Sequence, residues 1–162
     1  MSWRDMPYTD ALASLRRAHQ LCVDQPDLRR ALACMPDIGE SVLAFLNHAL
    51  DPPQPDEPPL QEIWELVPLL FKNLDDTQVA DLLGDVLFRA RQPAVYGLLA
   101  QGVRWRVPPA IAESALLAQL LSADPRRRSN AVDLAYFLFA EDPRYRLSEA
   151  GRAAVAASAR EH

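Results

Sequence analysis

Four residues in the first fifty carry side chains that bind metals or act as bases: His19, Cys22, Cys34 and His48. His19 and Cys22 are three residues apart, so a helix would place them on one face. Tetrahedral zinc would also need Cys34 and His48 to converge on them from two other helices. The chain lacks the closely spaced Cys-x-x-Cys or His-x-x-x-His pairs that make zinc sites recognisable. We therefore expect neither a metal nor another cofactor.

Catalytic chemistry has weak candidates. His19 and His48 are possible general bases, but no Gly-x-Ser-x-Gly elbow and no activated-cysteine context accompanies them. Paired acids occur at Asp75-Asp76, beside a predicted helix start, and at Asp56-Glu57, in a proline-rich stretch. Capping and solvation explain both pairs better than proton transfer does. The sequence predicts a protein that is not an enzyme, and a helical enzyme using either histidine is the third hypothesis.

Arginine clusters are the most unusual polar feature. The three clusters are Arg104, Trp105 and Arg106; Arg126, Arg127 and Arg128; and Arg144, Tyr145 and Arg146. Arg, Trp and Tyr are the residues that dominate binding hot spots. If the clusters occupy successive turns along one edge, they would form a surface for another protein. The alternative is that the turns are solvated and Trp105 packs inward.

A second functional hypothesis uses Arg126 to Arg128 alone. Arginines at a helix start oppose the helix dipole, and together with free N–H groups they favour an anion such as phosphate. A nucleic-acid or phospholigand binder is therefore the alternative to a protein-binding module. The net charge of −5 and the isoelectric point of about 5.1 disfavour nucleic acid.

The elements that would position these clusters are marked by regular helix-start signals. They are Pro59, Asp76, Pro93, Pro109, Pro125 and Pro143, separated by 17, 17, 16, 16 and 18 residues. Proline suits the first position of a helix because its missing N–H would have had no partner there. Two intervals give a period of about 33 to 34 residues, which is typical of helix-pair solenoids. The pattern predicts an all-α fold of about nine helices, as a short α-solenoid or an irregular bundle.

The chain divides into three predicted parts. Residues 1–51 contain three helices, the first starting near Thr9 or Asp10 and the third opened by a capping box from Asp37 to Glu40. Residues 52–59 form a proline-rich spacer, and residues 60–162 form the helical repeats. We expect the three parts to make one structural domain, because about fifty residues is marginal for an independent core.

Within the repeats, single residues predict interruptions. Pro68 should kink its helix, and Gly102 should end the helix that Pro93 opens. Ser148 should cap a final alanine-rich helix. Two short segments resemble known repeats. Residues 124–134, Asp-Pro-Arg-Arg-Arg-Ser-Asn-Ala-Val-Asp-Leu, look like the start of a HEAT-type repeat, and residues 95–102 are similar to the second helix and Gly turn of an ankyrin repeat.

Composition narrows the class of protein. Residues 1–81 carry fourteen acidic and six basic side chains, a net charge of −8, whereas residues 82–162 carry eight and eleven, a net charge of +3. Such a dipolar molecule can steer a partner of opposite pattern. The N-terminus lacks a secretory pattern, no apolar run suits a membrane, and arginine outnumbers lysine sixteen to one. These features predict a bacterial cytoplasmic protein-binding module, most specifically an immunity or antitoxin-type inhibitor, or an adaptor.

Overall fold

The protein is an all-α helical bundle. The computed structural model describes residues 2–25, 27, 30, 35, 37–51, 60–139 and 143–161, and within these ranges it contains eight α-helices and no strand. The α-helices are α1 (Tyr8–Asp24), α3 (Ile38–Ala49), α4 (Gln61–Leu70), α5 (Asp76–Gly84), α6 (Tyr96–Arg106), α7 (Pro109–Leu120), α8 (Pro125–Phe139) and α9 (Glu149–Ala159). Three short 3-10 helices join them: η1 (Phe71–Asn73), η2 (Val86–Arg89) and η3 (Pro93–Val95).

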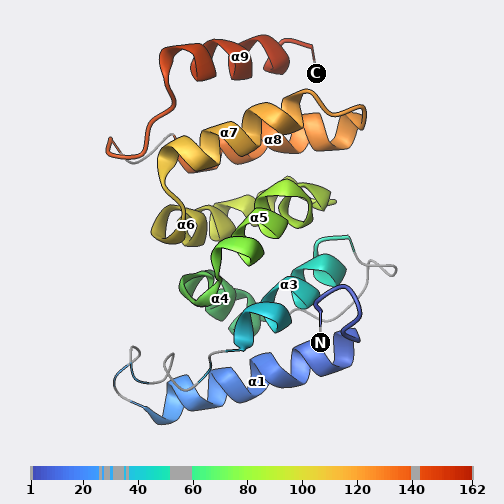
Figure 1. Cartoon of the computed structure of the whole chain (residues 1–162), viewed down its shortest axis with the longest axis vertical. Helices are drawn as coiled ribbons and strands as arrows, with labels where there is room; N and C mark the ends of the chain where they lie inside the picture. The colour runs from blue at the N-terminus through green and yellow to red at the C-terminus, as the bar shows by residue number, and fades with distance from the viewer. Residues whose placement is uncertain are drawn as a thin grey trace.

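The helices pack in two rows. In one row α3, α5, α7 and α9 each contact the next member, and in the other α4 contacts α6 and α6 contacts α8. Helix α1 covers the first end of both rows by packing on α3 and α4, and α9 covers the other end by packing on α7 and α8. Figure 1 shows α1 at one end of the long axis and α9 at the other, with the other helices stacked between them.

One hydrophobic core runs through both rows, from Trp3 near the N-terminus to Tyr145 before the last helix. Its largest fully buried side chains include Phe45 of α3, Phe88 of η2 and Tyr96 of α6. Burial of aromatic side chains of this size contributes about 2–3 kcal/mol each. The core therefore holds the two rows together over most of the described chain.

Three of the six regularly spaced start signals, Asp76, Pro109 and Pro125, are confirmed as the first residues of α-helices, whereas Pro93 begins η3 and α6 follows it from Tyr96. Asp75 caps α5 in a capping box with Gln78, whose backbone N–H donates to Asp75 Oδ1 at 2.8 Å. Helices α7 and α8 begin at Pro109 and Pro125, and Ser148 caps α9 by accepting a hydrogen bond from the Gly151 N–H at 3.0 Å. Helix α1 begins one residue before the predicted Thr9.

The predicted capping box at Asp37 is wrong. Helix α3 follows Asp37, but that side chain makes no capping hydrogen bond. Glu40, its expected partner, instead accepts a hydrogen bond from the Trp3 backbone N–H at 2.6 Å and another from the Gln78 side chain at 3.3 Å. The carboxylate therefore holds the N-terminal segment and α5 against α3.

Gly102 does not end its helix. Helix α6 continues to Arg106. Gly102 lies inside it, at the point where α6 comes closest to α4. A Cβ atom at Gly102 would lie 2.8 Å from the Pro68 carbonyl oxygen and 2.7 Å from Phe71 Cδ2. Pro68 lies inside α4, which passes into η1 two residues later.

Pro143 opens no helix, since it lies in the turn that precedes α9. Three other predictions, namely the helix between Pro26 and Pro36, the helix start at Pro59 and the spacer at 52–59, lie outside the described residues. Within the described ranges, none of the helices combines the length and apolar character needed to cross a bilayer.

Candidate functional site

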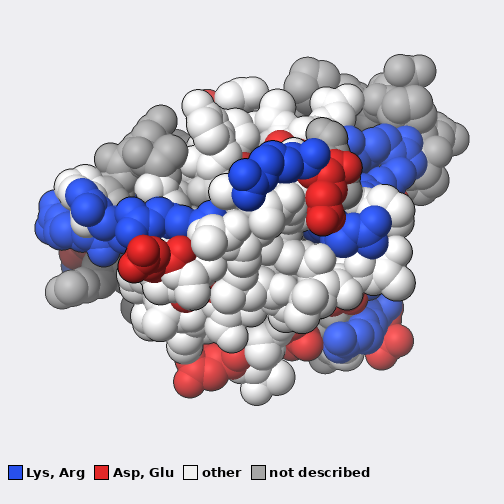
Figure 2. All heavy atoms as spheres, turned by 90° about the horizontal axis from the view of Figure 1, so that it is seen from above, with Lys and Arg blue, Asp and Glu red and all other residues white. Residues whose placement is uncertain are grey.

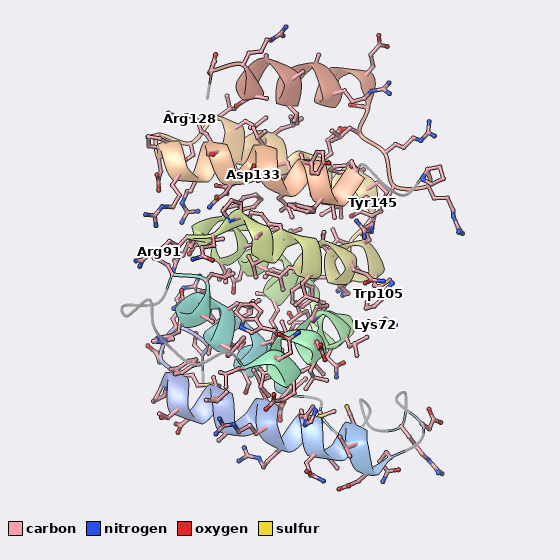
Figure 3. All side chains as sticks on the ribbon, turned by 180° about the vertical axis from the view of Figure 1, so that it is seen from behind. Lys72, Arg91, Trp105, Arg128, Asp133 and Tyr145 are labelled. Atoms are coloured by element: carbon pink, nitrogen blue, oxygen red, sulfur yellow. The ribbon has the colours of Figure 1, made fainter. Side chains whose placement is uncertain are left out.

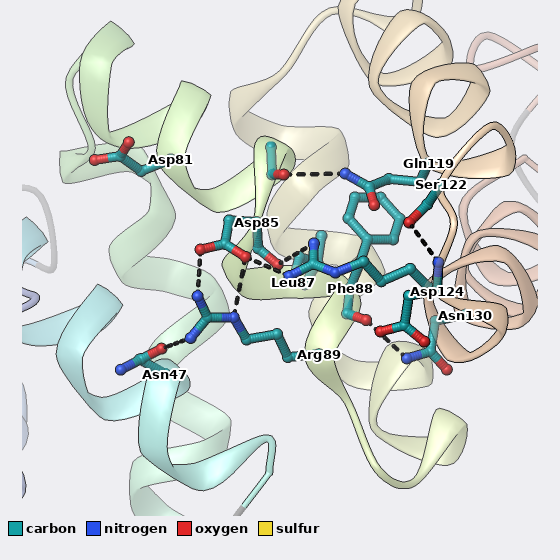
Figure 4. A network of polar contacts seen from close by, with 12 residues as sticks. Asn47, Asp81, Asp85, Leu87, Phe88, Arg89, Gln119, Ser122, Asp124 and Asn130 are labelled. Carbon is teal, nitrogen blue, oxygen red and sulfur yellow. Dashed lines mark hydrogen bonds and ion pairs between the residues drawn. The ribbon is translucent and has the colours of Figure 1, made fainter.

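The cluster Arg126 to Arg128 lies at the start of α8 and is bonded to the rest of the chain. Arg127 Nη2 pairs with Asp85 Oδ1 at 2.5 Å, and Asp85 also binds Arg89, whose guanidinium reaches Asn47 of α3. Figure 4 shows the Asp85 carboxylate beside the Arg89 guanidinium, and the same carboxylate also pairs with Arg127. The Asp85 carboxylate thus links η2 to α8, and Arg89 extends the link to α3.

The neighbouring arginines also have internal partners. Arg126 Nη1 lies 3.5 Å from Asp51 Oδ2, and Arg91 pairs with the same carboxylate at 2.8 Å. Arg128 Nη1 donates to the Ser122 carbonyl at 2.7 Å. We call this end of α8 the closed edge, and it consists of Asp51, Asp85, Arg89, Arg91, Arg126, Arg127 and Arg128.

The electrostatics of Asp85 follow from this geometry. Burial alone would raise the pKa of Asp85, but hydrogen bonds and charge from Arg127 and Arg89 outweigh it and hold the pKa below its ordinary value. The side chains of all three residues are a quarter to a third exposed. Asp85, Arg89 and Arg127 therefore form a partly buried ion network that stabilises the charged form of Asp85.

The cluster from Arg104 to Arg106 lies at the end of α6. Arg104 donates to the carbonyls of Phe137 and Leu138 at 2.8 and 3.2 Å, which caps the last turn of α8. Arg106 donates to the Leu74 carbonyl at 2.9 Å and pairs with the fully exposed Asp76.

Trp105, between these two arginines, is 44% exposed. The Lys72 ammonium lies 5.1 Å from the centre of its ring, within the range of a cation–π contact. Trp105 therefore does not pack inward, as the alternative had predicted.

The third cluster meets this one at the same edge. Tyr145 is buried, and its hydroxyl donates to the Val107 carbonyl at 2.7 Å, directly after the end of α6. Burial raises the pKa of Tyr145, and the charge of Arg104 opposes the rise. Arg144 and Arg146, on either side of Tyr145, are exposed. Tyr145 thus anchors the loop that carries two exposed guanidinium groups beside α6.

The nine predicted residues therefore lie on two edges instead of one. Helix α8 has 15 residues and spans about 22 Å, with Arg126 to Arg128 at its start and the loop of Tyr145 beyond its end. Figure 3 places Arg128 and Arg91 on one side of the molecule and Trp105, Lys72 and Tyr145 on the other. Figure 2 views the α9 end and shows Lys and Arg gathered at both sides, with a broad uncharged area in the lower middle.

We call the second edge the basic edge and define it by Lys72, Trp105, Arg144 and Arg146. Lys72 belongs to it although the sequence analysis did not select it, since a lone lysine gives no signal. The role of Asp85 was also missed, because only the packing of η2 on α8 brings it to Arg127.

The metal-ligand candidates do not form a cluster within the described residues. No group of three or more His, Cys, Asp or Glu side chains suits a metal ion there, and Cys34 lies outside those residues. His48 stacks on Tyr8, with ring centres 4.0 Å apart. Burial raises the pKa of the Cys22 thiol, which disfavours its thiolate form.

Comparison of the chain with known protein-family models, curated proteins and solved structures gives no match.

Proposed function

We propose that this chain is a non-enzymatic protein-binding module and that its basic edge contacts the partner. The observation that carries the proposal is the exposed Trp105, which lies under Lys72 and beside the loop of Arg144 and Arg146. A large aromatic side chain left in water next to several cations is typical of an interface anchor.

The internal bonds of the basic edge support this role. Tyr145 is held by the Val107 carbonyl, and Arg104 is held by the end of α8. The backbone that carries Trp105, Arg144 and Arg146 is thus fixed before a partner arrives, which lowers the entropy cost of binding. The surface would suit a partner that presents carboxylates around an apolar pocket for the indole ring.

The architecture that we propose for the module is a short α-solenoid of helix pairs. The two rows, one of α3, α5, α7 and α9 and the other of α4, α6 and α8, support it, as do the regular helix starts. Such stacks present long edges and faces to other proteins.

The specific version of the proposal is an immunity or antitoxin-type inhibitor in the bacterial cytoplasm, with an adaptor as the wider class. The charge of −8 in residues 1–81 supports it, because an acidic surface can cover a basic toxin. In this version both the acidic part and the basic edge contact the partner.

The test is affinity capture from the lysate of the native host, using the full chain as bait. We expect one stoichiometric protein partner, lost with the double variant Trp105→Ala/Arg144→Glu. The matched control is Leu121→Ala/Arg160→Glu, which makes the same kinds of change at exposed positions outside both the basic edge and residues 1–81. Equal capture by both double variants, with unchanged circular dichroism, would remove the basic edge from the proposal. A partner that stops growth when expressed alone would select the inhibitor version.

The alternative phosphate-binding hypothesis gains nothing from the geometry, since Arg126, Arg127 and Arg128 each bond within the chain. It predicts binding to a labelled oligonucleotide that weakens steeply with salt.

A further inference from the structure

A groove runs between the last two helices, at the end of the bundle opposite α1. Its volume is about 610 Å³, and it lies along α8 and α9, which run side by side at the top of Figure 1. The wall on α8 is formed by Val132, Ala135, Tyr136 and Phe139. These residues recur at intervals of three, one and three, so they form one continuous apolar stripe on the helix.

The opposite wall comes from α9. Arg152, Val155 and Ala159 line it, and their spacing of three and four residues also places them on one helix face. Two helical stripes thus face one channel, which is the arrangement that receives a third helix by its residues i, i+3, i+4 and i+7. Helix α9 has 11 residues and is about 16 Å long, which sets the length of the channel at about three helical turns.

The described lining of the groove is mostly apolar, and its charged members are both arginines. Tyr136 is 71% exposed, so a large aromatic side chain on the wall is left largely in water. Arg146 and Arg152 also line the groove, and no Asp or Glu is found among its described lining residues. A ligand that buries the tyrosine must therefore also bring negative charge to two guanidinium groups.

We propose that this groove binds an amphipathic acidic helix of a partner protein, with apolar residues on one face and Asp or Glu beside them. The helix would pack its apolar stripe on Tyr136 and Val155 and pair its carboxylates with Arg146 and Arg152. The inference rests on the proposed function in treating the chain as a protein-binding module. The groove shares Arg146 with the basic edge, but Trp105 and Lys72 are not among its lining residues.

The test uses a phage-displayed library of random 14-residue peptides, selected on the full chain. The double variant Tyr136→Ala/Arg152→Glu serves for counter-selection. We expect enriched peptides with apolar residues at i, i+3 or i+4, and i+7, and an excess of acidic residues. Synthetic copies should become helical on binding, as seen by circular dichroism. The proposal is overturned by a selection that enriches no peptide or enriches peptides without acidic residues.

Affinities of the enriched peptides, measured by fluorescence anisotropy, locate the site. Arg152→Glu and Tyr136→Ala should each weaken binding at least tenfold, an effect of about 1.4 kcal/mol. The matched control Arg16→Glu makes the same charge change on an exposed residue of α1, at the opposite end of the molecule, and should leave binding unchanged. Equal affinity for wild type and both groove variants would contradict the assignment.

Two further measurements distinguish peptide binding in the groove from binding at the basic edge and from dimerisation through the groove. Trp105→Ala should bind the peptides as wild type does, so a failure of the basic edge and a failure of the groove give different results. Light scattering after size exclusion should give the same mass for wild type and Tyr136→Ala. A concentration-dependent dimer that this substitution disrupts would overturn the proposal, since a second copy would then occupy the groove.

Discussion

Arginine clusters of similar composition lie at the two ends of α8, but their described contacts and exposure differ. At the closed edge, Arg127 pairs with Asp85 and Arg126 with Asp51, and both carboxylates also hold a second arginine. At the basic edge, Arg144 and Arg146 extend from the loop that Tyr145 anchors, and both are exposed.

The difference teaches that a run of arginines does not by itself make a binding surface. The described contacts differ between the two edges. The turn between α5 and η2 supplies Asp85 to the closed edge, whereas the C-terminal end of α6 supplies Trp105 and a carbonyl to the basic edge. The first edge stabilises the fold, and we propose that the second recognises a partner.

The largest expected effect tests the closed edge. Asp85→Ala should lower the free energy of unfolding by about 2 kcal/mol, because it leaves the partly buried Arg89 and Arg127 without their shared carboxylate. Asp76→Ala is the control, since the partner that it removes from Arg106 is fully exposed. It should cost little, because an ion pair with a fully exposed carboxylate contributes almost nothing to stability. Urea unfolding measures the loss of unfolding free energy in each variant. Equal losses would show that the closed edge does not stabilise the fold more than the Arg106–Asp76 pair does.

Acid should weaken the closed edge selectively. The pKa of Asp85 is lowered by folding, so its contribution is fully present above the unfolded pKa of about 3.9 and is lost as pH falls through the folded pKa. The stability difference between wild type and Asp85→Asn should thus shrink from about pH 4 downward. Urea unfolding of both proteins over that range provides the measurement. A constant difference would show that the charge of Asp85 is not its source.

The anchor of the basic edge should have a smaller effect. Tyr145→Phe keeps the buried ring and removes the hydroxyl that donates to the Val107 carbonyl. We expect a loss of about 1 kcal/mol, the usual contribution of one buried hydrogen bond. Tyr136→Phe serves as control because the Tyr136 side chain is 71% exposed, and thermal unfolding should show almost no change for it. An equal loss in the two variants would argue against the anchoring role.

The smallest effect on stability belongs to the exposed arginines. Arg144→Gln and Arg146→Gln should each change the free energy of unfolding by less than about 0.5 kcal/mol, as is usual for exposed substitutions. The same variants should weaken capture of the partner. A loss of stability above about 1 kcal/mol would mean that the basic edge, like the closed edge, serves the fold.

Helix starts could be predicted because their causes are local. A proline or an aspartate at the start of a helix acts within one turn, so Asp75, Pro109, Pro125 and Ser148 predicted their helices directly. Local capping rules gave the wrong prediction where a residue distant in sequence competes for the same side chain. Glu40 binds Trp3 and Gln78 in place of capping α3 with Asp37.

Packing explains the remaining differences between sequence and structure. Gly102 resembles a helix end in sequence, yet it is required for the contact of α6 with Pro68. Of the candidate site, the residue types were predictable and the exposure of Trp105 was not, since exposure depends on which neighbours cover the side chain. The separation of the two edges follows from the length of α8, which the sequence predicts. Which residues each cluster contacts depends on how the helices pack, and the sequence does not predict it.

Helix α9 is attached to the bundle in a way that sets its dynamics. Only Gly151 and Ser158 of this helix are buried, and its start is held by Glu113 of α7, which accepts hydrogen bonds from the Ser148 N–H at 2.5 Å and hydroxyl at 3.0 Å. A terminal element with so little buried apolar area opens at a lower free energy than the whole chain. Its amide hydrogens should therefore exchange with solvent ahead of those of α6 and α8, and the molecule can widen its last groove without unfolding the rest.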